Sequence, residues 1–282
     1  INTYGGVHSI RKRYVDAGGT KPYAVTEFGP PGTWEIPKNE WAAPAEMNST
    51  AKAEWYLSAH QKGIEAQKDL CLGSYVFIWG FKQEATATWF GLFLKDGARL
   101  GAVEAMTTAW GGKPPANRCP VVSDIALDRD RGLKKGDVIH SSWKASDPDG
   151  DPLTVKWILR RESGQYETGG DDQPDQPEFP DTVVESKVQT AAISIPESGG
   201  PYRLFGYAYD GKGNAAVANV RLHVEGKVLP PPVPVAKFPF SIYSDGGASQ
   251  PYAPSGYMGN TGAISMDPNC ADNPHGGTTC LK

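Results

Sequence analysis

The chain has 282 residues, which is long for one small domain and suits two or three. Its net charge of −4 is mildly acidic, and its Lys and Arg residues form no basic stripe, so we expect no nucleic-acid partner. No apolar run reaches the length of about 18 residues that a membrane-spanning helix needs, so the sequence predicts no transmembrane segment.

The first part of the chain predicts alternating strands and helices. Short apolar runs that stop at Gly or Pro indicate strands, and the longer segments between them suit helices. In chain order we expect a strand end at 1–4, a helix at 8–17, a strand that stops at Glu27, a helix capped by Thr50 that runs to about Lys68, a strand at 70–80 and a helix at 100–110. This order predicts parallel strands with crossover helices.

Glu27 is the most informative residue of this part. It ends the apolar run Tyr23-Ala-Val-Thr-Glu, and only Phe28 separates it from Gly29-Pro-Pro-Gly. A carboxylate at the tip of a buried parallel strand is costly to desolvate unless it has a function. In a (β/α)8 barrel, catalytic groups lie at this tip. A structural role for Glu27, in a helix cap or a salt bridge, is the alternative.

Three segments, INTYGG, KPYAVTEFGPPGTWE and CLGSYVFIWGFKQEATATWFGLF, together resemble the last quarter of a retaining glycoside hydrolase. The likeness is to TIM-barrel enzymes of the family 2 and family 5 type and to related β-1,3-glucanosyltransferases. It covers roughly residues 1–116 and implies the C-terminal part of a (β/α)8 barrel.

The resemblance assigns roles to individual residues. Glu27 corresponds to the nucleophile, Tyr4 to a phenol that hydrogen-bonds it, and Trp79 to the aromatic floor of a sugar subsite. Further residues in the loops after the strands are expected to border the sugar, namely Trp34, Glu84 and Trp89. Retaining hydrolysis uses two carboxyl groups about 5–5.5 Å apart, and flat sugar faces suit an indole ring. Each aromatic residue could instead have only a packing role in the core or in a loop.

The acid/base carboxyl group of such enzymes lies on an earlier barrel strand, and a closed barrel needs more strands than these segments supply. We therefore expect this chain to be part of a longer protein, secreted or at the cell surface, and to be inactive alone. The expected activity is that of a retaining β-glycosidase or glucan transglycosylase acting on a polysaccharide or oligosaccharide. The alternative is a non-catalytic carbohydrate-binding or cell-surface structural protein with a decayed or incomplete barrel.

A domain boundary is expected at Gly111-Gly-Lys-Pro-Pro-Ala-Asn117, after which the apolar period changes. Apolar residues then alternate with polar ones in several stretches separated by turns, which indicates antiparallel strands. Residues 117–226 have the length of an all-β immunoglobulin-like sandwich that folds independently. The segments SSWKASDPDGDPLTVKW and YRLFGYAYDGKGNAAVANVRLHV resemble cadherin- or PKD-like modules.

One turn of this region carries Asp147, Asp149 and Asp151, which raises the question of calcium. An EF-hand loop is excluded, because Pro152 occupies the position that requires Gly and Ile158 the position that requires Glu. We favour a turn with solvated aspartates, keep Ca²⁺ as the alternative and expect no other cofactor.

The last part of the chain predicts a Pro-rich linker at 227–237 and the start of a carbohydrate-binding β-sandwich at 238–282. At this size the final segment is too small to bury a core of its own, so it is expected to be a partial β-sandwich. A disulfide between Cys270 and Cys280 would stabilise it. Cys71 and Cys119 either form a second disulfide or remain free thiols. The expected architecture is multidomain: the C-terminal part of a barrel, an immunoglobulin-like sandwich and a partial β-sandwich.

Overall fold

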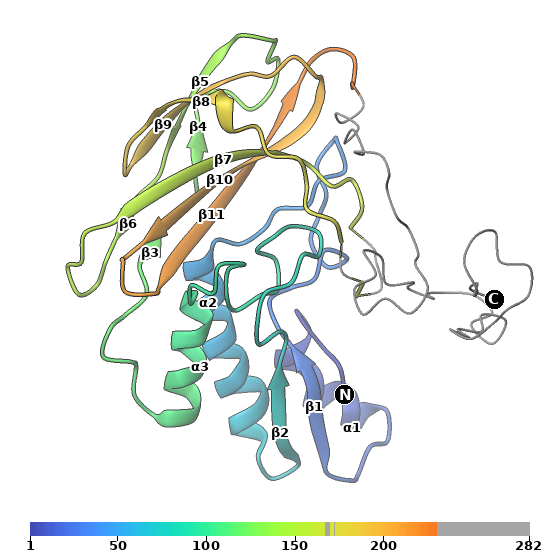
Figure 1. Cartoon of the computed structure of the whole chain (residues 1–282). Helices are drawn as coiled ribbons and strands as arrows, with labels where there is room; N and C mark the ends of the chain where they lie inside the picture. Colours follow the sequence, from blue (N-terminus) through green and yellow to red (C-terminus); the bar gives the residue numbers. More distant parts are fainter. Residues whose placement is uncertain (167–169, 172, 230–282) are drawn as a thin grey trace, which may run out of the picture. The chain divides into compact units, whose positions relative to one another are not determined.

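A computed structural model describes residues 1–166, 170–171 and 173–229 (Figure 1). Ile1–Leu229 forms one compact unit. The boundary expected near residue 117 lies inside this unit and stays a prediction. Most of the predicted linker, the predicted sandwich at 238–282 and the predicted Cys270–Cys280 disulfide lie outside the described residues.

The first region contains the parallel strands that the sequence predicts. β1 (Tyr23–Phe28) pairs in parallel with β2 (Cys71–Val76). The N-terminal residues run parallel to β1 on its other side: the Thr3 amide donates to the Glu27 carbonyl over 3.0 Å. The predicted parallel order is therefore confirmed, whereas a closed (β/α)8 barrel is not present in the described part of the chain.

The helices of this region agree closely with the predicted ranges. They are, in chain order, η1 (Val7–Ser9), α1 (Ile10–Asp16), α2 (Ser49–Ala59) with its continuations η2 (His60–Ile64) and η3 (Glu65–Gln67), and α3 (Gly101–Gly111). Gly112 ends α3 in the left-handed conformation (φ 75°), which glycine adopts without strain. The predicted cap of α2 was wrong by two residues, because the Asn48 side chain, not that of Thr50, accepts from the Ala51 amide.

The parallel strands bury one face against these helices. Tyr23, Val25 and Phe28 of β1 lie in one apolar cluster with α1, α2 and α3. β2 ends at Val76, four residues before the predicted end. The reason is a change of partner: the Ile78 amide donates to the Phe90 carbonyl over 3.2 Å, so residues after Val76 pair with the loop that follows.

The second region is a sandwich of two antiparallel sheets, as the alternation of apolar residues predicts. One sheet has the order β11-β10-β7 and the other the order β4-β5-β9-β8, with a small β3-β6 pair beside them. The strands are β3 (Val121–Val122), β4 (Ala126–Leu127), β5 (Val138–Ser142), β6 (Ala145–Ser146), β7 (Thr154–Arg161), β8 (Val183–Ser186), β9 (Thr190–Ser194), β10 (Gly200–Tyr209) and β11 (Ala215–Val224), and the short helix η4 (Pro180–Thr182) precedes β8. Their inner faces form one continuous core around Trp143 and Trp157, whose ring centroids lie 5.0 Å apart.

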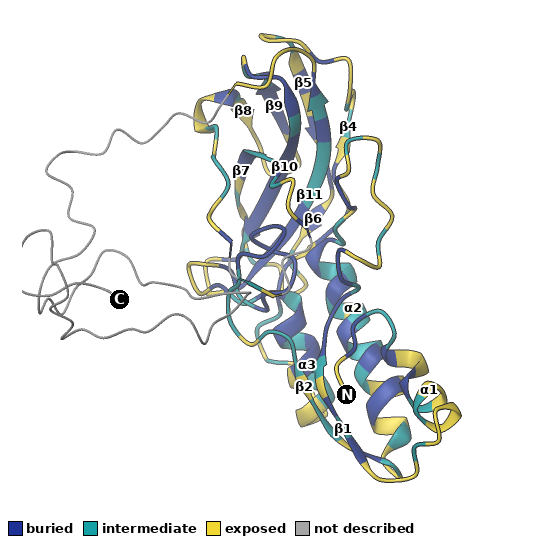
Figure 2. Ribbon diagram, turned by 90° about the vertical axis from the view of Figure 1, so that its right-hand side faces the viewer, coloured by how far each residue is buried: buried dark blue, intermediate teal, exposed yellow. Residues whose placement is uncertain are grey.

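The outer face of the β11-β10-β7 sheet is buried as well. It packs on the loop that precedes α3, and Figure 2 shows β10 and β11 mostly buried. This second apolar cluster consists of Leu94, Ala98, Leu100, Ile158, Phe205, Tyr207, Ala215 and Val217. Burial on both faces explains why residues 204–209 form a nearly continuous apolar run.

A buried polar network joins the two regions beside this cluster. Glu46 accepts from Lys52 Nζ over 2.6 Å through one carboxylate oxygen and from Asn219 Nδ2 over 2.8 Å through the other. Arg203 on β10 donates to Glu162 over 2.8 Å and to the Asn219 side-chain oxygen over 2.7 Å. The four charged side chains are nearly fully buried. We refer to Glu46, Lys52, Glu162, Arg203 and Asn219 as the junction network.

The first turn of α2 supplies three further polar contacts with the sandwich. The Asn48 side chain donates to Asp124 over 2.6 Å. The Ser49 hydroxyl accepts from the Val217 amide over 2.9 Å, and the Thr50 hydroxyl accepts from the Val122 amide over 2.8 Å. One helix terminus therefore satisfies backbone groups on two different strands of the sandwich.

Candidate functional site

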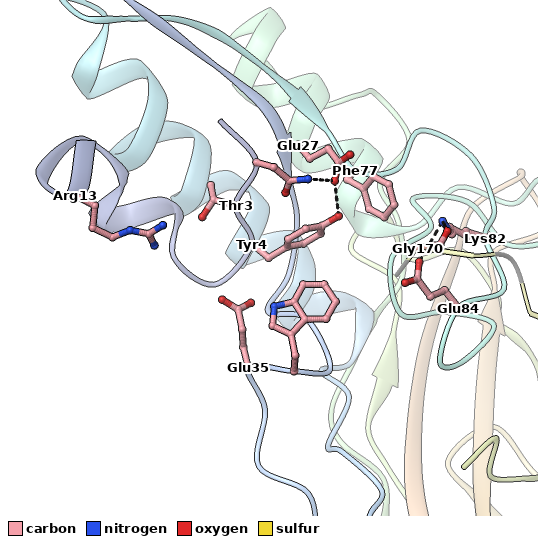
Figure 3. Close-up of a pocket in the computed structure, with 11 residues that line it drawn as sticks. Thr3, Tyr4, Arg13, Glu27, Glu35, Phe77, Lys82, Glu84 and Gly170 are labelled. Atoms are coloured by element: carbon pink, nitrogen blue, oxygen red, sulfur yellow. Dashed lines mark hydrogen bonds and ion pairs between the residues drawn. The ribbon is translucent and has the colours of Figure 1, made fainter. Parts of the chain in front are cut away.

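A pocket of about 740 Å³ opens at the C-terminal ends of the parallel strands (Figure 3). Its wall combines carboxylates, cations and aromatic rings. The lining residues are Asn2, Thr3, Tyr4, Arg13, Glu27, Trp34, Glu35, Phe77, Lys82, Glu84 and Gly170. Polar groups that converge with aromatic faces in a concavity are typical of a ligand site.

Glu27 lies near the end of β1 and faces this pocket. Its Oε2 accepts a hydrogen bond from Asn2 Nδ2 over 2.6 Å and another from the Tyr4 hydroxyl over 2.8 Å. The hydrogen bond that the resemblance implies between Tyr4 and Glu27 is therefore present. Because both donors approach the same oxygen, they fix the orientation of the carboxylate.

Tyr4 is held in a cluster of aromatic rings. Its ring meets Trp34, Phe77 and Phe90 edge to face, with centroids 5.3, 5.6 and 5.5 Å away. Burial, together with the hydrogen bond to Glu27 and the negative charge of that residue, raises the pKa of the Tyr4 phenol far above its ordinary value. Tyr4 therefore keeps its proton and acts as a hydrogen-bond donor.

The opposite wall carries an ion pair. Lys82 Nζ lies 3.2 Å from a Glu84 carboxylate oxygen, and both side chains are mostly buried. Lys82 also donates to the Gly170 carbonyl and lies 5.1 Å above the Phe77 ring. Figure 3 shows this pair on one side of Tyr4 and Glu35 on the other. Glu35 accepts from the Gly5 and Gly32 amides, each over 2.8 Å.

The structure brings together four of the six residues expected at a sugar site: Tyr4, Glu27, Trp34 and Glu84. Trp34 is 54% exposed and presents its indole to the pocket. Sequence reasoning missed Asn2, Phe77 and Lys82. The sequence could have indicated Asn2 as a pocket residue, because it lies two residues before Tyr4 and alternate residues of a strand share a face.

Trp79 and Trp89 do not line the pocket. β2 ends earlier than predicted, so Phe77 occupies the place expected for Trp79. Trp79 instead packs against Phe93 and Trp110, with centroids 5.3 and 6.2 Å away. Trp89 is only 2% exposed, and its Nε1 donates to the Pro31 carbonyl over 3.1 Å. It anchors the loop after β1 and cannot reach a ligand in the pocket.

The possible disulfide between Cys71 and Cys119 is absent, and both are buried free thiols. Cys71 begins β2, whereas the chain after α3 runs back along that helix, so the Cys119 amide donates to Glu104 in the first turn of α3. The two thiols therefore lie at opposite ends of the region. Burial, reinforced by the Glu104 charge, raises the pKa of the Cys119 thiol to about 12.

The carboxylates of Asp147, Asp149 and Asp151 gather in one turn, with oxygens within 4.8 Å of one another. Asp147 accepts from the backbone amides of Asp149 and Asp151 over 2.9 and 3.1 Å. Asp151 pairs with Lys212 over 2.6 Å, and this partner lowers the pKa of Asp151. Protein donors reach part of the cluster, but Asp147 Oδ2 is buried without a hydrogen-bond partner. The choice between a turn with solvated aspartates and a Ca²⁺ site therefore stays a prediction.

No helix in the described residues combines the length and the apolar character that crossing a membrane requires. The chain matches no family model and no curated protein.

Among solved structures, the chain is similar to PKD domains. The PKD1 domain of Vibrio anguillarum Epp shares 17% identity, with 40% of this chain and 99% of that chain covered and a TM-score of 0.23. The PKD domain of an M14-like peptidase from a Thermoplasmatales archaeon shares 16% identity, with 39% and 100% covered and a TM-score of 0.24. The PKD1 domain of the Vibrio cholerae metalloprotease PrtV shares 16% identity, with 38% and 99% covered and a TM-score of 0.23. At these low TM-scores, the immunoglobulin-like architecture rests on the strand pairing itself.

Proposed function

We propose that this chain contributes the nucleophile to a retaining β-glycosidase or glucan transglycosylase that acts on polysaccharide outside the cell. The observation that supports this proposal most is the environment of Glu27. Its carboxylate lies at the end of a parallel strand, is oriented by Asn2 and Tyr4, and faces a large polar pocket.

In the proposed reaction, a Glu27 oxygen attacks the anomeric carbon and the bond to the leaving sugar breaks as the glycosyl–enzyme bond forms. The leaving oxygen takes a proton from a carboxylic acid. Water or a hydroxyl group of another sugar then attacks the anomeric carbon, gives its proton to the carboxylate left by that acid, and releases Glu27. Tyr4 stays protonated throughout and orients the carboxylate.

We assign no acid/base to the described residues. Glu35 accepts hydrogen bonds from two backbone amides, and Glu84 is paired with Lys82, so we assign the proton-donor role to neither. Their proposed role is to bind hydroxyl groups, while Trp34 stacks on the flat face of a sugar ring. The catalytic proton donor is therefore sought outside the described residues.

The test is covalent trapping in the natural full-length protein with an activated 2-deoxy-2-fluoro aryl β-glycoside. We expect mass spectrometry to find the fluoro-sugar on the peptide that contains Glu27. Glu27→Gln should remove the adduct and lower turnover by several orders of magnitude with the fold intact. Glu54→Gln is the matched control, because Glu54 is exposed on α2 and should leave both unchanged.

Near-normal turnover in Glu27→Gln would rule out the proposed nucleophile. A wild-type protein that binds polysaccharide but forms no adduct would instead favour the non-catalytic carbohydrate-binding function.

A further inference from the structure

The segment that carries Glu84 has an unusual backbone. Ala85 adopts a positive φ of 62°, which side chains other than glycine rarely accept. Glu84 and Thr86 exchange backbone hydrogen bonds across it, over 2.7 and 3.2 Å. Such a conformation persists only where its surroundings hold it in place. The residues that contact Ala85 therefore help to determine the position of the neighbouring Glu84.

Gln173, from the segment between β7 and β8 of the sandwich, supplies these surroundings. Its backbone amide donates to the Gln83 carbonyl over 2.7 Å, and its side-chain oxygen accepts from the Ala85 amide over 2.7 Å. The Gln173 side-chain nitrogen donates to the Gln165 carbonyl over 3.1 Å. Gln173 is buried and thus bonds the backbone on both sides of Glu84.

The same sandwich segment is anchored near Gln173. Tyr166 packs in the apolar cluster that contains Tyr4 and Trp89, and its carbonyl accepts from the Thr33 hydroxyl. The Tyr166 hydroxyl donates over 2.7 Å to Glu162, a member of the junction network. A continuous set of buried contacts therefore runs from the centre of the junction to the pocket wall.

We propose that Gln173 is a positioning residue for the pocket: the sandwich holds Glu84 in place through Gln173, and Glu84 with Lys82 hydrogen-bonds the hydroxyl groups of a sugar bound beside Glu27. The binding of a sugar rests on the proposed function. The contact of Gln173 with the Glu84 segment is independent of that function. The sandwich is thus part of the binding site rather than a separate accessory module.

The first experiment measures amide hydrogen exchange of the full chain by mass spectrometry. Gln173→Ala removes the acceptor of the Ala85 amide, so exchange in a peptide spanning 83–88 should accelerate by about tenfold or more. Gln173→Glu retains an acceptor oxygen and should restore most of the protection. Gln165→Ala, in the same segment, is the matched control, because the Gln165 side chain is exposed and its backbone carbonyl is retained, and it should leave that peptide unchanged. Unchanged exchange in Gln173→Ala would overturn the inference.

The second experiment is a double-mutant cycle in the natural full-length protein with an aryl β-glycoside as the probe. Gln173→Ala should raise KM by about 2–12-fold, the range for one hydrogen bond, and leave kcat within about twofold. If Gln173 acts through Glu84, adding Gln173→Ala to Glu84→Ala should produce no further change. Additive effects would show that Gln173 acts independently of Glu84 and overturn the inference.

The hydrogen-exchange experiment and the Glu27 tests of the proposed function together separate the two proposals. Faster exchange in Gln173→Ala together with full turnover in Glu27→Gln would refute the glycosidase mechanism and support the contact with Gln173. A fluoro-sugar adduct on Glu27, together with unchanged hydrogen exchange in Gln173→Ala, would support the glycosidase mechanism and refute the role of Gln173.

Discussion

The two regions of Ile1–Leu229 bury their sheets to different extents. The β11-β10-β7 sheet of the sandwich is covered on one face by the second sheet and on the other by residues of the first region. The parallel strands are covered by helices on one face, but Leu72 and Tyr75 of β2 remain 76% and 69% exposed. The comparison teaches that the sandwich sheet is covered on both faces, whereas the parallel strands are covered on one.

The largest expected effect comes from breaking the junction network. Glu46→Gln leaves the buried Lys52 without its counter-charge, while Arg203 keeps only Glu162, so we expect the free energy of unfolding to fall by about 3–5 kcal/mol. Urea denaturation measures this change. Removing the exposed Lys135–Glu197 pair by Lys135→Ala is the control, with an expected cost of about 0–1 kcal/mol. Similar values for both variants would contradict a stabilising junction.

The junction also predicts a dependence on pH. Burial alone would raise the pKa of Glu46, but Lys52 and Arg203 override it and lower that pKa below its ordinary value. The stabilisation is therefore complete above the unfolded pKa of about 4.3 and is lost as pH falls through the lower folded value. Wild-type stability should fall in this acid range more steeply than that of Glu46→Gln, and equal slopes would contradict the assignment.

A smaller effect is expected in the core of the sandwich. Leu204 on β10 is fully buried, so Leu204→Ala should lower the free energy of unfolding by about 2–5 kcal/mol through lost burial and the cavity left behind. Thermal or urea unfolding measures the loss. A cost below about 1 kcal/mol would mean that the core repacks around the missing side chain.

The smallest expected change in stability is at β2. Leu72→Ser replaces an exposed apolar side chain, so stability should stay within about 0.5 kcal/mol of the wild type. Solubility should rise, because exposed apolar surface favours association. Light scattering across a concentration series measures this gain. A large loss of stability would show that Leu72 has a packing partner in solution.

The sequence predicts the elements of this fold well because their signals are local. Apolar runs that end at glycine or proline locate β1 and β2, and alternation locates the strands of the sandwich. Glu27 was found because it ends an apolar run, and Tyr4 was assigned beside it through the resemblance to retaining glycoside hydrolases. The exact end of β2 was missed, which moved the expected aromatic residue from Phe77 to Trp79.

Contacts between distant residues gave no such signal. Gln173 and Ala85 are 88 positions apart, and Gln173 belongs to no motif. Glu46 and Arg203 also come from different regions, and single charged residues in a sequence usually indicate a solvated surface. Their burial follows only once the sheet of the sandwich packs on the first region. Lys82 was missed in part for the same reason, since its contact with the Gly170 carbonyl depends on that packing.

The first turn of α2 has a consequence for protein engineering. Ser49 and Thr50 accept from the Val217 and Val122 amides, so exchanging the sandwich for an unrelated module would remove the partners of these hydroxyls and of Asn48. A chimera joined within the Pro-containing segment before Asn117 would preserve the chain connection but not this interface. Successful recombination therefore requires α2 and the sandwich to be transferred as one block.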